Sequence, residues 1–131
     1  MKEPKEPGVL VIEDDQFVLR YTAATIAALG YQKVRTASSA ADARVLLFAQ
    51  RFELVICDIC LPDGDGRQLV REVFALNPNA RVILISAFLY QALMIPADLY
   101  GKVELLEKPF TPEDLHQLLG HLSGARVAVK G

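Results

Sequence analysis

Short apolar runs, each ended by a polar residue, are the feature of this sequence that most constrains its fold. They cover residues 9–12, 54–57 and 82–85, and each stops at a carboxylate or a hydroxyl. Such runs are typical of strands that are buried on both faces of a parallel sheet. They are also far shorter than the roughly 18 apolar residues that a membrane-spanning helix needs. The sequence therefore predicts a globular protein with a buried sheet and no membrane contact.

Between these runs, apolar residues recur at helical spacing. The predicted strands cover residues 9–12, 33–36, 54–57, 81–85 and 103–106. The predicted helices cover about residues 18–29, 40–47, 69–76, 88–95 and 112–122. Strands that alternate with helices in this way predict right-handed crossovers and helices on both faces of one sheet. We therefore expect an α/β fold with a doubly wound, five-stranded parallel sheet.

Length and charge limit the class of protein. The chain of 131 residues fits a single domain, with a core at about residues 8–123 and tails at 1–7 and 124–131. The first tail is charged and rich in proline, so it lacks the apolar centre of a signal peptide, and we expect the cytoplasm. The formal charge is −2, and the basic residues are scattered along the chain. This pattern argues against direct binding of nucleic acid.

Polar residues follow the predicted strands at the point where each strand ends. In chain order they are Glu13, Asp14 and Asp15, then Asp58, then Ser86, and finally Lys108. Ligands of open α/β sheets bind beyond this edge, so we expect these side chains to converge there. Clustered carboxylates repel one another unless a cation lies among them, and oxygen ligands without histidine or thiolate suit Mg²⁺. The sequence therefore predicts a magnesium site that handles a phosphoryl group.

Four motifs in this order carry a resemblance to a known family. They are Glu13-Asp14, Asp58 with Leu61-Pro62 and Asp65-Gly66 behind it, Ser86-Ala87, and Lys108-Pro109-Phe110. Over about residues 8–123 the chain resembles the response-regulator receiver domain of two-component signalling. The resemblance implies a flavodoxin-like sheet of strand order 2-1-3-4-5. It also implies a cis peptide bond between Lys108 and Pro109.

The resemblance further implies a role for each residue of the site. Asp58 would accept the phosphoryl group from a histidine kinase or a phosphotransfer protein. Ser86 would bond a phosphoryl oxygen, and Lys108 would pair with the phosphoryl group or with Asp58. The implied magnesium ligands are Glu13, Asp14, Asp58 and the backbone carbonyl of Cys60. The expected function is that of a signalling switch, which changes its protein contacts when it is phosphorylated. We do not expect an enzyme that turns over a substrate.

Three other functions stay open at this stage. A receiver-like interaction module that is never phosphorylated is suggested by Leu105, because the family usually has an aromatic residue three positions before its lysine. A hydrolase of small phosphate esters would need a substrate pocket, and nothing beyond Asp63 and Asp65 suggests one. Flavin binding would need a loop rich in serine, threonine and glycine after the first strand, where this chain has three acids. We assign Asp15, Asp63 and Asp65 as turn or cap residues.

An apolar segment after Ser86 suggests a contact surface. The residues around Phe88, Tyr90 and Leu105 are too apolar for one helix face to bury, so we expect this surface to bind a downstream partner or a second copy of the chain. The two cysteines and the two histidines are assigned structural roles. We interpret Cys57-x-x-Cys60 as a strand end followed by a loop rather than as a redox motif. We expect His116 and His121 to face solvent.

Overall fold

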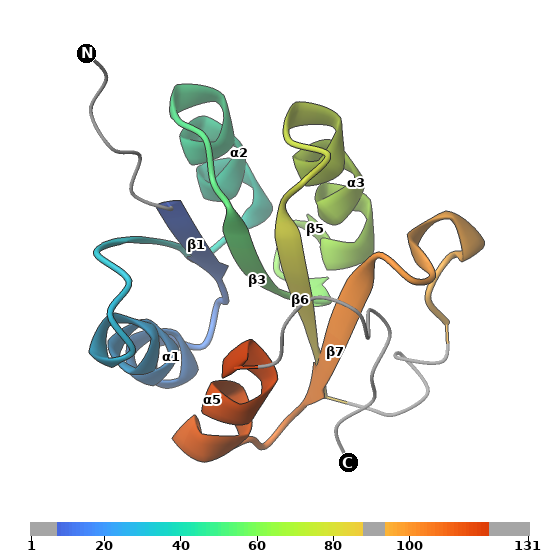
Figure 1. The fold of residues 1–131 in the computed structure, drawn as a ribbon. Helices are drawn as coiled ribbons and strands as arrows, with labels where there is room; N and C mark the ends of the chain where they lie inside the picture. Colours follow the sequence, from blue (N-terminus) through green and yellow to red (C-terminus); the bar gives the residue numbers. More distant parts are fainter. Residues whose placement is uncertain (1–7, 88–93, 121–131) are drawn as a thin grey trace.

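The central sheet of the protein has five parallel strands (Figure 1). The structure is a computed structural model that describes residues 8–87 and 94–120. In chain order the strands of this sheet are β1 (Gly8–Ile12), β2 (Lys33–Ala37), β3 (Leu54–Asp58), β6 (Arg81–Ser86) and β7 (Val103–Glu107). Their spatial order is β2-β1-β3-β6-β7. This is the predicted order 2-1-3-4-5, and the predicted fold class is confirmed.

Helices cover both faces of the sheet. They are α1 (Gln16–Ala28), α2 (Ala40–Ala49), α3 (Gly66–Leu76), the short 3-10 helix η1 (Ala97–Leu99) and α5 (Pro112–Gly120). Figure 1 shows α1 and α5 on one side of the sheet and α2 and α3 on the other. Alternate residues of β1 follow this division, since Val9 and Val11 pack toward α1 and α5 while Leu10 and Ile12 pack toward α2 and α3. β1, β3, β6 and β7 are therefore buried on both faces, as predicted, whereas the edge strand β2 is largely exposed.

The segment after β6 differs from the prediction where it can be compared. Most of the helix expected at residues 88–95 lies outside the described residues. Met94 and Ile95 are described and are not helical, and η1 follows Pro96. The ion pair between Arg71 of α3 and Asp98 of η1, at 2.8 Å, joins the two elements. None of the described helices is both long and apolar enough to cross a membrane.

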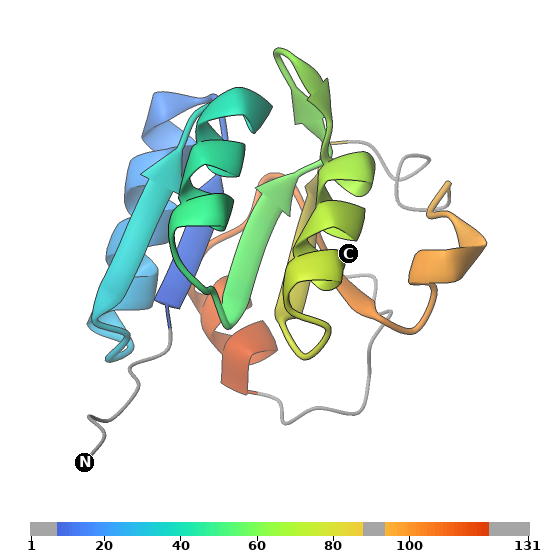
Figure 2. The same cartoon turned by 90° about the horizontal axis from the view of Figure 1, so that it is seen from above.

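A small hairpin beyond β3 was not predicted. It consists of β4 (Cys60–Leu61) and β5 (Gly64–Asp65), and Figure 2 shows it projecting past the end of β3. Asp63 in its turn accepts hydrogen bonds from the backbone N–H groups of Ala40 and Ala41, at 2.7 and 2.9 Å. These bonds lower the pKa of Asp63. Asp63 thus caps the start of α2, which stabilises the free N–H groups of that helix end.

The other acids assigned to turns also cap helices. The carboxylate of Asp15 accepts from the N–H groups of Phe17 and Val18 at the start of α1. Asp65 accepts from the N–H of Arg67 at the start of α3. The assignment of these acids as caps is confirmed, although the distant helix that Asp63 caps could not be read from local spacing.

Candidate functional site

The carboxyl edge of the sheet gathers the polar residues that follow the strands. Asp58 is the last residue of β3, and Ser86 is the last residue of β6. Glu13 directly follows β1, and Lys108 directly follows β7. The register places these ends level with one another, because Asp58 pairs with Ile85 in the neighbouring strand. The convergence expected from the strand pattern is therefore present.

Three carboxylates form the centre of the site. Glu13, Asp14 and Asp58 each offer an oxygen, and these oxygens all lie within 4.8 Å of one another. Glu13 and Asp58 are buried, whereas Asp14 is exposed. Two carboxylates of the cluster are thus buried, and the third faces solvent. Oxygen ligands in this arrangement suit Mg²⁺, which takes one or two carboxylates and keeps several waters.

Lys108 joins the two buried carboxylates. Its Nζ lies 2.7 Å from Oδ2 of Asp58 and 3.0 Å from Oε1 of Glu13. Burial disfavours the charge on Lys108, but the hydrogen bonds and charges of Asp58 and Glu13 outweigh this effect and raise its pKa. Lys108 therefore stays an ammonium at neutral pH. The peptide bond that follows it, to Pro109, is cis, as the resemblance implied.

One ammonium does not neutralise this group of acids. Burial, with the nearby charge of Asp58, raises the pKa of Glu13 to about 7, although the N–H of Asp15 and the ammonium of Lys108 act in the opposite direction. A carboxyl with such a pKa is only partly ionised at neutral pH. A divalent cation among the three carboxylates would remove the conflict and favour the ionised form. The residues present therefore fit a magnesium ion.

Asp58 is held on both of its oxygens. Lys108 contacts Oδ2, and the backbone N–H of Cys60 donates to Oδ1 at 2.9 Å. Ser86 is buried beside it, and the backbone N–H of Lys108 donates to the Ser86 carbonyl at 2.8 Å. These contacts orient the Asp58 carboxylate at the edge of the sheet. Which side chains contact a phosphoryl group, and whether the carbonyl of Cys60 binds a metal, stay predictions.

Gly66 is a structural requirement of the site that side-chain chemistry could not reveal. A Cβ at this position would collide with the backbone carbonyl of Asp58. The N–H of Gly66 also donates to the carbonyl of Ile59 at 2.7 Å. Only glycine allows the start of α3 to approach the end of β3 this closely. The motif Asp65-Gly66 was the available signal in the sequence.

The cysteines of the C-x-x-C pattern differ in their surroundings. Cys57 is a buried free thiol at the sheet centre, and burial raises its pKa. Cys60 is exposed at the start of the hairpin. The buried strand position agrees with the interpretation of Cys57 as a core residue. His116 is exposed as expected, and His121 lies outside the described residues.

Leu105 does not itself form surface. Its side chain is 2% exposed and belongs to the same apolar cluster as Ile95 and Leu99. The contact surface expected around Phe88, Tyr90 and Leu105 therefore needs correction at this residue, since a buried side chain offers no contact area. Phe88 and Tyr90 lie outside the described residues.

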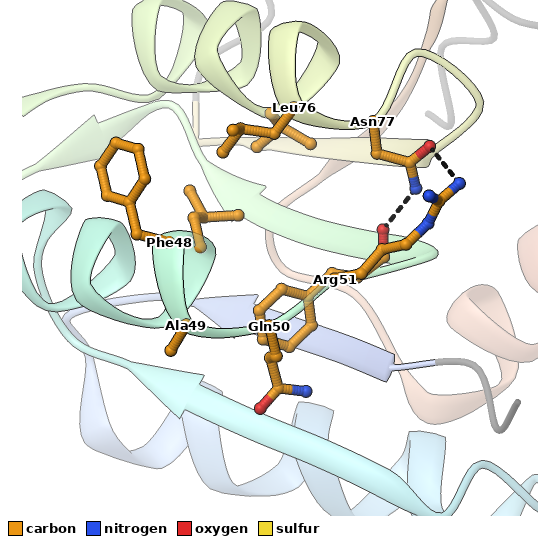
Figure 3. Close-up of a pocket in the computed structure, with 9 residues that line it drawn as sticks. Phe48, Ala49, Gln50, Arg51, Leu76 and Asn77 are labelled. Atoms are coloured by element: carbon orange, nitrogen blue, oxygen red, sulfur yellow. Dashed lines mark hydrogen bonds between the residues drawn. The ribbon is translucent and has the colours of Figure 1, made fainter.

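A pocket of about 260 Å³ lies at the opposite edge of the sheet, between the ends of α2 and α3. Figure 3 shows Phe48 and Leu76 on its walls and Arg51 beside Asn77. Arg51 donates to the side-chain oxygen of Asn77 at 3.1 Å, and the amide of Asn77 donates to the carbonyl of Phe52 at 2.8 Å. These residues lie next to the amino end of β3, so the pocket is separate from the acidic site.

Comparison with known proteins agrees with the fold. The sequence profile of the family described as "Response regulator receiver domain" matches residues 9–120. The chain is 28% identical to the chemotaxis protein CheY of Thermotoga maritima over 115 residues, which cover 88% of this chain and 96% of that protein. It is 30% identical to the response regulator receiver protein CpdR of Brucella abortus over 107 residues, or 82% of this chain and 88% of that protein.

Some relatives are longer than this chain. The transcriptional regulatory protein AlgB of Pseudomonas aeruginosa is 31% identical over 111 residues, which are 85% of this chain but only 24% of AlgB. The shared part is therefore one segment of that regulator.

Solved structures show the same fold. The receiver domain of DrrB matches with a TM-score of 0.74 at 26% identity, over 88% of this chain and 95% of that one. CheY4 of Vibrio cholerae matches with a TM-score of 0.77 at 23% identity, over 88% and 97% of the two chains. TrrA of Thermotoga maritima, solved in complex with Mg²⁺ and BeF, matches with a TM-score of 0.74 at 22% identity, over 86% and 96%. With the profile match and the acidic edge of the sheet, these likenesses show that the chain belongs to the family of response regulator receiver domains.

Proposed function

We propose that Asp58 is the phosphoacceptor of this receiver domain. The observation that carries the proposal is the position of its carboxylate, which is buried at the carboxyl edge of the sheet and held by Lys108 at 2.7 Å beside Glu13 and Asp14. A carboxylate oxygen of Asp58 would attack the phosphorus of a phosphohistidine. The phosphorus–nitrogen bond would break, an acyl phosphate would form, and the histidine of the donor would leave as the neutral imidazole after taking up a proton.

The other residues of the site would position and neutralise the phosphoryl group. Lys108 can move from Asp58 to a phosphoryl oxygen with little displacement, because it already lies at the acceptor atom. Ser86 ends the adjacent strand and would donate its hydroxyl. Phosphoryl transfer depends mainly on such positioning and charge stabilisation. These roles match the binding capacity of an ammonium and a hydroxyl.

We propose that Mg²⁺ is the cofactor. Its ligands would be Glu13, Asp14, Asp58 and the backbone carbonyl of Cys60. A bound magnesium ion would act as a Lewis acid and would neutralise charge on the transferring phosphoryl oxygens. The related protein TrrA was solved with Mg²⁺ and BeF, which supports this assignment by likeness of fold.

The proposed partners are a histidine kinase or phosphotransfer protein as donor and a protein as downstream target. Phosphorylation adds charge at the edge of the sheet and would shift an equilibrium between two conformations that differ in partner affinity. The chain would act as a single receiver unit and not as a turnover enzyme. The structure argues against the phosphate-ester hydrolase, because Asp63 and Asp65 are already engaged as helix caps.

The test is phosphorylation by acetyl phosphate, followed by intact mass measurement. We expect a mass increase of one phosphoryl group that requires Mg²⁺ and is absent in Asp58→Asn. The matched control is Asp65→Asn, which changes an acid of the same loop outside the metal group. Phosphorylation that survives in Asp58→Asn would refute the assignment. Absence of any adduct in the wild type would favour the interaction module, and repeated ester turnover would favour the hydrolase.

A further inference from the structure

Tyr21 connects α1 to the turn that carries Lys108. Its hydroxyl donates a hydrogen bond of 2.6 Å to the backbone carbonyl of Phe110, which lies 89 residues away in the sequence. Its ring packs against the ring of Phe110, with 5.5 Å between the ring centroids. The ring of Phe17 also packs against it in a T-shaped arrangement, at 5.7 Å between centroids. Tyr21 is therefore attached to this turn through both its hydroxyl and its ring.

The contacted carbonyl belongs to the second residue after Lys108. On the preceding side, the backbone N–H of Lys108 donates to the carbonyl of Ser86 at 2.8 Å. The main chain around Lys108 is thus held by β6 before the turn and by Tyr21 after it. The ammonium at the end of this side chain must reach Asp58 at 2.7 Å and Glu13 at 3.0 Å together. A small shift of the turn would lengthen both contacts.

Tyr21 is suited to this position because it stays a donor. Burial raises the pKa of the Tyr21 hydroxyl, with smaller contributions from the charges of Glu13, Asp114 and Asp15, although Lys108 acts in the opposite direction. The charges of Glu13 and Lys108 thus act on Tyr21, which places it within the electrostatic surroundings of the site. Phenylalanine would keep the ring contacts and lose only the hydrogen bond.

We propose that Tyr21 is a positioning residue for Lys108. Its hydrogen bond to the Phe110 carbonyl holds the turn after β7, and this turn holds the ammonium on the carboxylates. The proposal rests on the proposed function, since it assigns an effect of Tyr21 on phosphorylation of Asp58. Tyr21 also connects the part of the site that carries Lys108 to the part that carries Glu13. Tyr21 lies on α1, Asp15 caps the start of this helix, and Glu13 lies two residues before Asp15.

A double-mutant cycle with Lys108 tests the proposal. The initial rate of phosphorylation by acetyl phosphate at saturating Mg²⁺ is measured for the wild type, Tyr21→Phe, Lys108→Ala and the double variant. We expect Tyr21→Phe to react about fivefold more slowly, the change that corresponds to one net neutral hydrogen bond. In the Lys108→Ala background the same substitution should change the rate by less than about 1.5-fold, because the group it positions is gone.

The matched control is Thr25→Val. Thr25 lies on the same helix, and its hydroxyl donates to the carbonyl of Tyr21 at 2.7 Å, so the substitution also removes one hydroxyl hydrogen bond from α1. We expect it to lower the melting temperature as much as Tyr21→Phe does and to leave the phosphorylation rate unchanged. If Lys108→Ala does not fold, Lys108→Met, which keeps most of the aliphatic stem, takes its place in the cycle.

The outcomes separate this proposal from the proposed function. Equal rates for Tyr21→Phe and the wild type would overturn the positioning role and leave Asp58 as the acceptor. An effect of Tyr21→Phe that persists in full without Lys108 would show that Tyr21 acts on stability or on another residue. A phosphorylated Asp58→Asn would instead refute the proposed function itself.

Discussion

Two charged groups lie near opposite edges of the same sheet and differ in how their charges are balanced. Near the amino edge, the guanidinium of Arg81 forms two bonds to the carboxylate of Glu104, at 2.6 and 2.9 Å. It also donates to the carbonyls of Leu119 and Leu118 at the end of α5, at 3.1 and 2.6 Å. One cation meets one buried carboxylate and two helix-terminal carbonyls. This group is complete within the described chain.

The carboxyl edge has the opposite balance. There a single ammonium, Lys108, serves the buried acids Glu13 and Asp58, with Asp14 exposed beside them. The bond to Glu104 raises the pKa of Arg81, whereas burial raises the pKa of Glu13 to about 7. Paired charges therefore stabilise the fold at one edge. The excess of acid at the other edge leaves three clustered carboxylates, which fit a cation.

The largest expected effect follows from breaking the balanced group. Arg81→Met keeps the aliphatic stem but leaves Glu104 buried without its cation. Removing one partner of such a pair typically costs about 3–5 kcal/mol, and we expect a loss of this size in the free energy of unfolding from urea titration. Folded Arg81→Met should still be phosphorylated on Asp58.

The control for this substitution is Arg44→Met. Arg44 forms a bidentate pair with Glu72, but both side chains are partly exposed, at 42% and 34%. Solvent screens the attraction within such an exposed pair, so the control should change the unfolding free energy little. Equal losses in the two variants would show that the group near the amino edge has no special weight in the fold.

A second prediction concerns the pH dependence caused by Glu13. The pKa of Glu13 is raised from its usual value of 4.5, which applies to the unfolded chain, to about 7 in the folded protein. Between these two pH values the folded protein therefore holds a proton that the unfolded chain has lost. The stability from this proton is complete below about pH 4.5 and is lost as the pH rises through 7. Without Mg²⁺, Glu13→Gln should therefore be more stable than the wild type at pH 8, by up to about 3 kcal/mol.

Urea titrations at pH 5, 6, 7 and 8 in the presence of a chelator measure this difference. The gap between Glu13→Gln and the wild type should widen from pH 5 to pH 8. The control Glu53→Gln changes an exposed acid and should show no such widening. A constant gap across this range would mean that Glu13 is ionised throughout and that the acidic edge is already balanced.

The smallest expected effect comes from adding Mg²⁺. At about ten times its dissociation constant, Mg²⁺ should raise the unfolding free energy of the wild type by about 1.4 kcal/mol at pH 7.5. Asp14 is exposed, so Asp14→Asn should leave the stability of the metal-free protein nearly unchanged while removing most of this gain. Thermal unfolding with and without Mg²⁺ measures both quantities. An undiminished gain in Asp14→Asn would place the ion elsewhere.

Much of the site could be predicted because its residues follow strands directly. Glu13, Asp58, Ser86 and Lys108 each lie at or next to a strand end, and parallel strands end at a common edge. A local apolar pattern was therefore enough to place them together. The cap roles of Asp15 and Asp65 are local as well, since each binds N–H groups within three residues.

Other features depend on contacts between distant residues. Asp63 caps a helix that begins 23 residues earlier, and Arg81 meets Glu104 at the same separation of 23 residues. The bond between Tyr21 and the Phe110 carbonyl spans 89 residues. No periodicity or turn motif encodes such a pairing, because the partners meet only when the sheet brings their elements together.

The sequence by itself determined the five strands of the parallel sheet, the four described α-helices, their alternation and the acidic character of one edge, because apolar periodicity and strand-end chemistry are local properties. Only the tertiary structure decided how the charges are shared. It buried Glu13 beside Asp58, where both carboxylates contact the ammonium of Lys108. It also paired Arg81 with Glu104 and formed the hydrogen bond between Tyr21 and the turn after Lys108. The physical reason is that burial and neighbouring charges set pKa values and pair energies, and both arise from packing between elements.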